Sequence, residues 1–226
     1  MSFLLKSILT NKWSKVGVFA LCLVPVTRLI WKGVHQDLGA NPVEFIQRDL
    51  GDWILIFLVA TLAVTPARRI LHQPNLIRFR RMLGLFAFFY ACLHFTTYIW
   101  LDQSLSFSAI MKDVGKRPFI TAGFTGFVLL VPLAVTSTAG WVRRLGGKHW
   151  QQLHKLIYIS ATAGVVHYYW LVKSDIRKPV AYGIVTGFLL VYRLAARLMR
   201  KQYGTTGRIQ QRRPKLTAAA KPAETA

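Results

Sequence analysis

Residues Met82–Leu101, MLGLFAFFYACLHFTTYIWL, form a run without a charged side chain. A helix of about 20 apolar residues is long enough to cross the hydrocarbon core of a bilayer, and this run reaches that length. Residues Pro118–Val142 form a second uncharged run of sufficient length. These two runs by themselves predict membrane-spanning helices.

Four shorter uncharged runs accompany these two. They are Val16–Thr27, Trp53–Ala67, Leu156–Val172 and Pro179–Tyr192. We therefore expect an all-α, polytopic membrane helix bundle with about six transmembrane helices. Trp53–Ala67 is the weakest candidate because it is short and meets Pro66, so five spans with a re-entrant second segment is the alternative.

The composition is strongly basic, with 30 Lys+Arg against 8 Asp+Glu, a net charge of +22 and a pI near 10.8. Such a pI is typical of nucleic-acid-binding domains. Here, however, the charges lie between long uncharged runs rather than on one solvated face, which argues against nucleic acid as a partner. Cys22 and Cys92 both lie in apolar runs, which excludes a disulfide scaffold and a cysteine-cluster metal site.

The basic residues divide unequally between the two sides of the membrane. With six spans, 21 of the 30 fall on the side that holds both termini and 8 on the opposite side, while Arg28 lies within the first helix. The positive-inside rule therefore predicts that both termini are cytoplasmic. Seven of the eight acids lie on the outer side, where the first loop suggests either an acidic docking surface or solvated side chains. These loop acids are Asp37, Glu44, Asp49 and Asp52.

Residues 1–200 are expected to form one transmembrane domain. Residues 201–226 are rich in Arg, Gln, Pro and Ala, and they predict a disordered basic cytoplasmic tail near anionic membrane lipid. The loops contain no glycine-rich dinucleotide fingerprint, no Walker loop and no room for a soluble catalytic domain. Any electron or substrate carrier that needs such a site must therefore come from another protein.

Three histidines, His94, His154 and His167, lie in or beside the uncharged runs. Ionisable side chains are costly in a bilayer, so these are candidate functional residues, with a neutral imidazole bonded to a neighbouring helix as the alternative. His94 follows Met82 at the same spacing at which His167 follows Lys155. At the rise of an α-helix, both are therefore expected about 18 Å above the cytoplasmic boundary. Two imidazoles at one depth on separate helices can bind a haem iron axially.

His154 is expected about 20 Å below His167, at the inner boundary. In a regular helix, the spacing between the two places their rings about 140° apart. Both rings can face one bundle interior only if the helix contains a bulge or a kink, which Gly164 would permit. Otherwise His154 serves a different site.

These features favour a transmembrane electron conduit without a substrate site of its own, so whether the chain is itself an enzyme stays open. Two other classes use the same histidines. One is a proton or solute transporter with the histidines as a relay, and the other is a structural membrane anchor in which they are hydrogen-bond partners. Carboxylates inside the spans would favour the transporter, and the uncharged runs contain none.

Several short motifs are more specific than the runs. They are LGANPV (38–43), TPAR (65–68), Gln73-Pro74, IRFRRMLGL (77–85), Leu93-His94 with Tyr98, Arg117-Pro118-Phe119, Thr136-Ser137-Thr138, WQQLHKLIY (150–158) and His167-Tyr168. Over about residues 38–170 the chain resembles the haem-binding membrane subunits of the bacterial periplasmic methionine-sulfoxide reductase system, the MsrQ family, formerly YedZ. That family belongs to the ferric-reductase-like transmembrane domains.

The resemblance implies b-type haem, one or two, held by His94, His154 and His167, with FMN as a further cofactor. It implies a multi-pass protein of the bacterial inner membrane that takes electrons from the quinone pool or from a cytosolic flavin reductase. The acceptor would be the periplasmic molybdenum-containing methionine-sulfoxide reductase catalytic subunit, which repairs oxidised envelope proteins.

One position departs from the wider superfamily, whose oxidases carry a second histidine on helix three, four turns before the first. The matching position before His94 is Arg80, which cannot ligate iron while protonated. We therefore expect His94 and His167 to bind an outer haem, whereas an inner haem on His154 would lack the usual sixth ligand. Arg80 and Arg81 could pair with haem propionates or a flavin phosphate, or could simply mark the cytoplasmic side.

Overall fold

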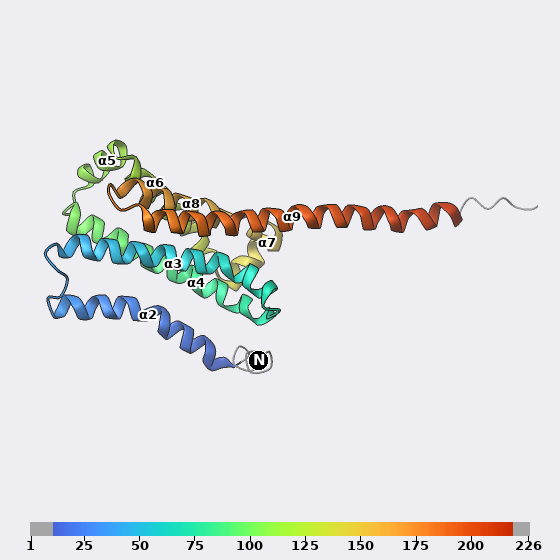
Figure 1. Cartoon of the computed structure of the whole chain (residues 1–226), viewed down its shortest axis with the longest axis horizontal. Helices are drawn as coiled ribbons and strands as arrows, with labels where there is room; N and C mark the ends of the chain where they lie inside the picture. Colours follow the sequence, from blue (N-terminus) through green and yellow to red (C-terminus); the bar gives the residue numbers. More distant parts are fainter. Residues whose placement is uncertain (1–10, 219–226) are drawn as a thin grey trace, which may run out of the picture. The chain divides into compact units, whose positions relative to one another are not determined.

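A computed structural model describes residues 11–218 of the chain, and residues 1–10 and 219–226 lie outside the described part. The described residues are helical and contain no strand (Figure 1). The longer helices are α2 (Lys12–Val34), α3 (Pro42–Ile70), α4 (Ile77–Thr97), α6 (Pro118–Val135), α8 (Leu156–Leu171) and α9 (Arg177–Ala218). Two shorter helices, α5 (Phe107–Lys116) and α7 (Ala139–Leu153), connect them, and short η1 (Pro74–Leu76) and η2 (Tyr98–Asp102) segments flank α4.

The helices confirm the membrane bundle. Five segments are long and apolar enough to cross a bilayer, namely Trp13–Val34, Pro42–Ile70, Pro74–Asp102, Pro118–Val135 and Arg177–Met199. The remaining predicted run, Leu156–Val172, forms α8, which has 16 residues and is shorter than these five segments. The cytoplasmic placement of both termini stays a prediction.

The second predicted span is longer in the structure than its uncharged run suggests. Trp53–Ala67 looked like the weakest candidate, but it lies within α3, a continuous helix of 29 residues, so the re-entrant alternative is wrong. Asn41 caps the helix by accepting a hydrogen bond from the Glu44 amide, and Pro42 occupies a first-turn position that needs no amide donor. Pro66 lies close to the other end of the helix and does not stop it.

The fourth uncharged run, Pro118–Val142, does not form one helix. Helix α6 ends at Val135 and α7 begins at Ala139. The hydroxyls of Thr136 and Ser137 donate back to the carbonyls of Pro132 and Leu133, and Thr138 caps α7. Side chains of this kind compete with the helical hydrogen bonds, which explains why the helix stops inside an uncharged run.

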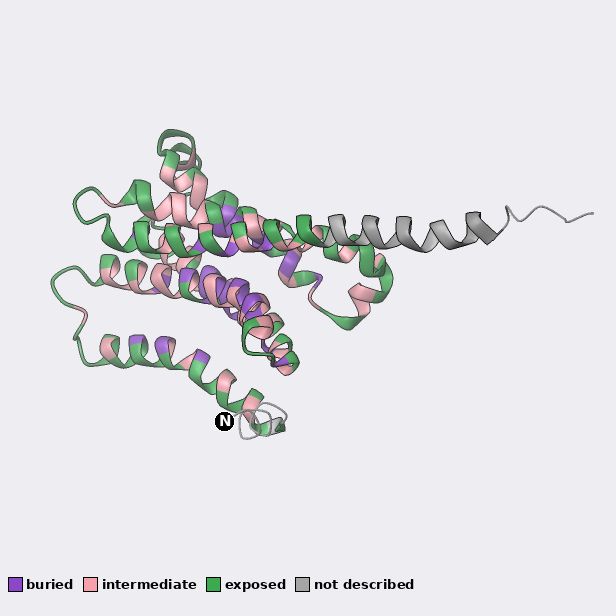
Figure 2. Cartoon of the chain, turned by 45° about the vertical axis from the view of Figure 1, so that its right-hand side comes forward, coloured by how far each residue is buried: buried purple, intermediate pink, exposed green. Residues whose placement is uncertain are grey.

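Four helices form the core. Helix α3 packs along α4 and α6 packs along α8, and narrower contacts between α4 and α6 and between α3 and α8 close the ring (Figure 1). Buried side chains concentrate on α3 and α4 (Figure 2). Between α6 and α8, the Ser160 hydroxyl donates to the Gly126 carbonyl over 2.8 Å.

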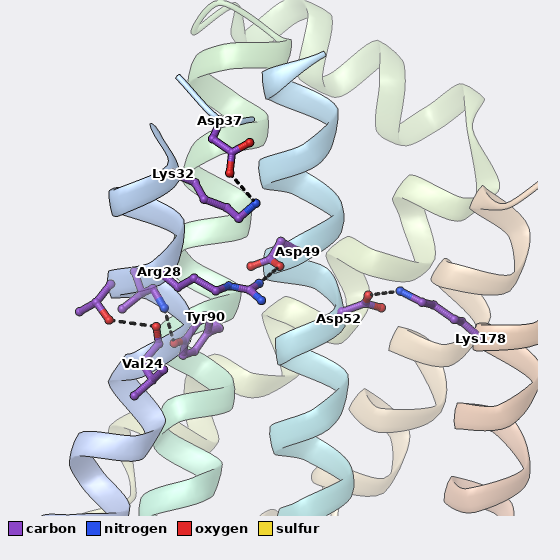
Figure 3. A network of polar contacts seen from close by, with 10 residues as sticks. Val24, Arg28, Lys32, Asp37, Asp49, Asp52, Tyr90 and Lys178 are labelled. Carbon is purple, nitrogen blue, oxygen red and sulfur yellow. Dashed lines mark hydrogen bonds and ion pairs between the residues drawn. The ribbon is translucent and has the colours of Figure 1, made fainter. Parts of the chain in front are cut away.

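Helix α2 is attached to this core by polar contacts of Tyr90 and Arg28 (Figure 3), and Arg78 of α4 donates to the carbonyl of Asn11, which caps α2. In a regular helix the Val26 amide would donate to the Cys22 carbonyl. Instead the Tyr90 hydroxyl of α4 lies between them, accepting from the Val26 amide over 3.1 Å and donating to the Cys22 carbonyl over 2.9 Å. Pro25 weakens the helix at this turn because it lacks an amide hydrogen. One turn later Arg28, the base that interrupts the apolar part of the first span, pairs with Asp49 of α3.

Residues from Phe188 onward form a compact unit separate from residues 1–187. Their backbone continues as helix to Ala218, within the segment 201–226 that the sequence predicts to be a disordered basic tail. Residues 219–226 lie outside the described part, and the disorder of the tail stays a prediction.

Replacement of Tyr90 by Phe should loosen α2 without unfolding the core. Loss of a buried hydroxyl that makes two hydrogen bonds should destabilise the attachment of α2 by about 1 kcal/mol. The population in which α2 is detached should then rise roughly fivefold. Cys22 is 4% exposed beneath this turn, so its thiol reports the opening. We expect maleimide to label Cys22 several-fold faster in Tyr90→Phe, with Cys92→Ser as background. Tyr169→Phe, at an exposed tyrosine, is the control, and equal rates in both variants would contradict the role of the Tyr90 hydroxyl.

Candidate functional site

His94 of α4 and His167 of α8 face each other inside the four-helix core. Their ring centroids are 6.3 Å apart and the ring planes are inclined at 83°. The two helices that carry them occupy opposite corners of the ring of four, so the imidazoles meet near its centre. The equal spacing of both residues from the charged boundary therefore predicted a pair that the structure brings together.

Each imidazole is held by a main-chain carbonyl from a neighbouring helix. His94 Nδ1 lies 3.1 Å from the Gln47 carbonyl oxygen of α3, and His167 Nδ1 lies 2.6 Å from the Phe119 carbonyl oxygen of α6. A carbonyl oxygen only accepts, so Nδ1 carries the proton in both rings. The lone pair is then on Nε2. This tautomer and this type of support are typical of histidines that ligate a metal.

A glycine lies four residues after each carbonyl and contacts the ring, and Gly123 makes room for His167. A Cβ atom on Gly51 would lie 3.7 Å from His94 Cε1, whereas one on Gly123 would lie 2.7 Å from His167 Nδ1. The first distance is an ordinary contact, but the second is a collision. The pairs α3–α4 and α6–α8 thus repeat one arrangement of a carbonyl, a glycine one turn later and a histidine on the partner helix.

The spacing of the rings fits two axial ligands of one metal atom. Two metal–nitrogen bonds of about 2 Å in line, together with the distance from Nε2 to the centre of each ring, give roughly 6 Å between centroids. The observed 6.3 Å agrees with this value. Within residues 11–218 no group of three or more His, Cys, Asp or Glu side chains could hold a metal ion. A haem iron suits the pair because the macrocycle supplies the other four nitrogens.

His154 lies apart from this pair, at the end of α7. Its Nε2 is 3.0 Å from the Thr136 hydroxyl, which itself donates to the Pro132 carbonyl and therefore accepts from His154. Trp150 stacks on the His154 ring at 3.9 Å between centroids and donates its indole N–H to the Thr136 carbonyl. Burial, and then the positive charge of Arg80, lower the pKa of His154 and favour the neutral ring. Arg80 and His154 thus belong to one environment.

The break in the fifth predicted span lies before α8 and not at Gly164, where a kink was expected. A turn at His154 and Lys155 separates α7 from α8, whereas Gly164 lies inside α8. The predicted rotation between the two rings assumed one continuous helix from His154 to His167 and does not apply across this break. The break meets the condition under which both rings could face one bundle interior, and whether His154 serves a different site from His167 stays a prediction.

The four acids of the first loop and the start of α3 are each paired with a base. Figure 3 shows the pairs of Asp37, Asp49 and Asp52, and an acidic docking surface stays a prediction. The pairs are Asp37 with Lys32, Glu44 with Arg48, Asp49 with Arg28, and Asp52 with Lys178. Their charges are largely neutralised, and the pairs tie α2, α3 and the first turn of α9 together.

The sequence did not reveal the supports of the two histidines. Gln47 and Phe119 act through main-chain oxygens, which no side-chain motif records, and Gly123 acts through a missing side chain. In the sequence, these supports leave only one trace, a glycine four residues after Gln47 and after Phe119, near the start of α3 and of α6. That pattern is too common to single out a site.

These features define a class of protein, a helical membrane protein whose four-helix core brings two imidazoles together, with 6.3 Å between their ring centroids. A family model described as "Ferric reductase like transmembrane component" matches residues 50–165, a segment that includes His94 and His154 and ends two residues before His167.

Curated relatives narrow this class. The "Protein-methionine-sulfoxide reductase heme-binding subunit MsrQ" of Herminiimonas arsenicoxydans is 54% identical over 182 residues, 80% of this chain and 84% of that protein. The proteins of the same name from Rhodospirillum rubrum and Caulobacter vibrioides are 49% identical over 197 and 177 residues. Those matches cover 86% and 78% of this chain, and 93% and 84% of the relatives. The chain therefore belongs to the MsrQ family of ferric-reductase-like transmembrane proteins, and the resemblance inferred from the motifs is confirmed.

Replacement of Gly123 by Ala should displace His167. The new methyl group would collide with the ring, which must move and lose its hydrogen bond to Phe119, so the free energy of unfolding in detergent should fall by about 1–3 kcal/mol. Gly51→Ala should be milder because its contact is an ordinary one. Gly17→Ala, where a Cβ meets nothing within 4 Å, is the control for replacing a helical glycine. A Gly123 variant as stable as the Gly17 variant would contradict the close packing of His167.

Proposed function

We propose that this protein is a membrane electron-transfer subunit in which His94 and His167 hold a b-type haem. The observation that carries the proposal is the pair of Nδ1-protonated imidazoles with centroids 6.3 Å apart. The relatives that share half of its sequence are named heme-binding subunits of a protein-methionine-sulfoxide reductase, which supports the same assignment.

A haem bound between the two histidines supplies a one-electron redox centre. The protein's part is to fix both rings: the Gln47 and Phe119 carbonyls set the tautomer and the orientation, and Gly123 lets α6 approach His167. With His94 and His167 both holding the haem, the group would supply electron transfer rather than a place for a substrate to bind. The absence of a nucleotide-binding motif in the sequence agrees with a subunit that receives and passes electrons but has no substrate site.

We infer that electrons enter at the His154 end and leave at the His94–His167 end, with both termini at the entry side in the cytoplasm. Proximity of Arg80 to His154 gives this end a cationic environment suited to a haem propionate or the phosphate of FMN. The proposed donor is the quinone pool or a cytosolic flavin reductase. The proposed acceptor is a periplasmic molybdenum-containing methionine-sulfoxide reductase, which places the protein in a bacterial inner membrane.

The visible spectrum of the purified protein tests the haem assignment. We expect a Soret band that shifts on reduction with dithionite and is lost in His94→Ala and in His167→Ala, because each removes an axial ligand. His35→Ala is the matched control, since His35 ends α2 at an exposed position with its ring stacked on Trp31. A folded, colourless protein produced with an adequate haem supply would exclude the conduit and leave a transporter or a structural anchor.

The separate position of His154 leads to a different expectation. His154→Ala should keep at least part of the Soret band while slowing reduction by a quinol or a reduced flavin added from the cytoplasmic side. Thr136→Val keeps the imidazole but removes the hydroxyl that holds its Nε2, so it separates loss of the ring from loss of its orientation. Complete loss of haem in His154→Ala, equal to that in the other two variants, would reject the division into two sites.

A further inference from the structure

Helix α5 joins the spanning helices α4 and α6 at the end of the bundle that holds His94 and His167. It has ten residues, and the Ser106 side chain caps it by accepting from the Ala109 amide. Phe107 and Met111 lie one turn apart on one stripe of the helix, with exposed fractions of 76% and 55%. Lys112 and Lys116, both exposed, lie on the next stripe, about 100° around the helix.

The side of α5 that faces the protein is fixed by polar contacts. Asp113, with only 12% of its side chain exposed, accepts hydrogen bonds from the Tyr98 hydroxyl over 3.0 Å and the Gln103 amide over 3.3 Å. It also pairs with Arg117 over 3.0 Å. On the other flank, the Thr121 hydroxyl of α6 donates to the Val114 carbonyl. These contacts hold the helix in one rotation, with Phe107 and Met111 turned outward.

The position of α5 along the chain determines what lies against its outward face. The candidate spans on either side end at Asp102 and begin at Pro118, so only the segment 103–117 connects two helices that cross the bilayer. A segment this short must stay at the membrane surface. Leu105 and Trp100, 67% and 64% exposed, extend the outward apolar surface toward the end of α4. Tryptophan is typical of the headgroup layer.

We propose that α5 is an interfacial helix that binds phospholipid. Leu105, Phe107 and Met111 insert at the boundary between headgroups and acyl chains, and Lys112 and Lys116 contact lipid phosphates. An apolar stripe beside a stripe of lysines is typical of helices that lie in the plane of a membrane surface. Because Asp113 holds Tyr98, one turn after His94, the lipid-bound helix fixes the end of α4 next to the histidine pair. This inference does not depend on haem.

A pair of spin labels on adjacent residues tests the proposal. Labels at Met111→Cys and Lys112→Cys are placed in a Cys92→Ser background, where Cys22 is buried, and the full chain is reconstituted in phosphatidylcholine nanodiscs. We expect oxygen to reach the label at position 111, and a water-soluble nickel chelate the label at position 112, each several-fold more than the other label. Equal access of the chelate to both would show a solvated helix and overturn the proposal. Protection of position 111 only after a periplasmic reductase is added would show a protein-docking surface and overturn it too.

The lysines are tested by lipid charge. Phosphatidylglycerol in the nanodiscs should further lower the chelate access at position 111 at low salt, and high salt should cancel this change because it screens charges at a surface. Lys112→Gln combined with Lys116→Gln should remove the effect of phosphatidylglycerol while leaving the insertion in phosphatidylcholine. An undiminished lipid-charge effect in the double variant would overturn the contact between these lysines and phosphate. Far-UV circular dichroism verifies that each variant is folded.

Discussion

Two hydrogen bonds, from Nδ1 of His94 to the Gln47 carbonyl and from Nδ1 of His167 to the Phe119 carbonyl, determine what this membrane bundle can hold. In hydrocarbon an imidazole must find a partner inside the protein. A helix carbonyl can accept a second hydrogen bond only from a side chain that approaches the backbone closely. The missing side chain at Gly123 makes that approach possible for His167, and α3 and α6 therefore lie directly behind the rings carried by α4 and α8. The four-helix ring is thus built around two oriented imidazoles.

The same requirement explains how α2 is attached. It lies outside the segment that matches the ferric-reductase-like family, and many of its apolar side chains are exposed, as suits a helix that contacts lipid. Apolar contact with neighbouring helices gains little in a membrane, where lipid tails are equally apolar, so polar contacts must supply the specificity. Tyr90 replaces one hydrogen bond of α2 beside Pro25, and Arg28 meets Asp49. Each contact satisfies a group that would be costly to leave alone in the bilayer.

The sequence predicts the helices and the histidine pair well because both depend on simple counts. Uncharged runs identify the spans, and equal spacing from the charged boundary places His94 and His167 at one depth. Prediction from the sequence fails where two charged side chains far apart in the chain form an ion pair. Helix α3 looked too short because Asp49 and Asp52 interrupt the apolar run, and their partners Arg28 and Lys178 lie on other helices, far away in sequence. Likewise, the break at Thr136 depends on side-chain hydrogen bonds within an uncharged run. The supports at Gln47, Gly51, Phe119 and Gly123 have no side-chain signature at all.

The three candidate histidines differ in which nitrogen the protein occupies. In His94 and His167 the hydrogen bond uses Nδ1 and leaves Nε2 for a metal, whereas in His154 the Thr136 hydroxyl holds Nε2. For His154 to bind iron through Nε2 it must give up that hydrogen bond, at a cost of about 1 kcal/mol, and the Trp150 ring stacked on it must allow the movement. The pair of His94 and His167 therefore already has its Nε2 atoms free of hydrogen bonds to the protein, while His154 would need a rearrangement. If the chain holds a metal at both places, the protein prepares the first place more fully than the second.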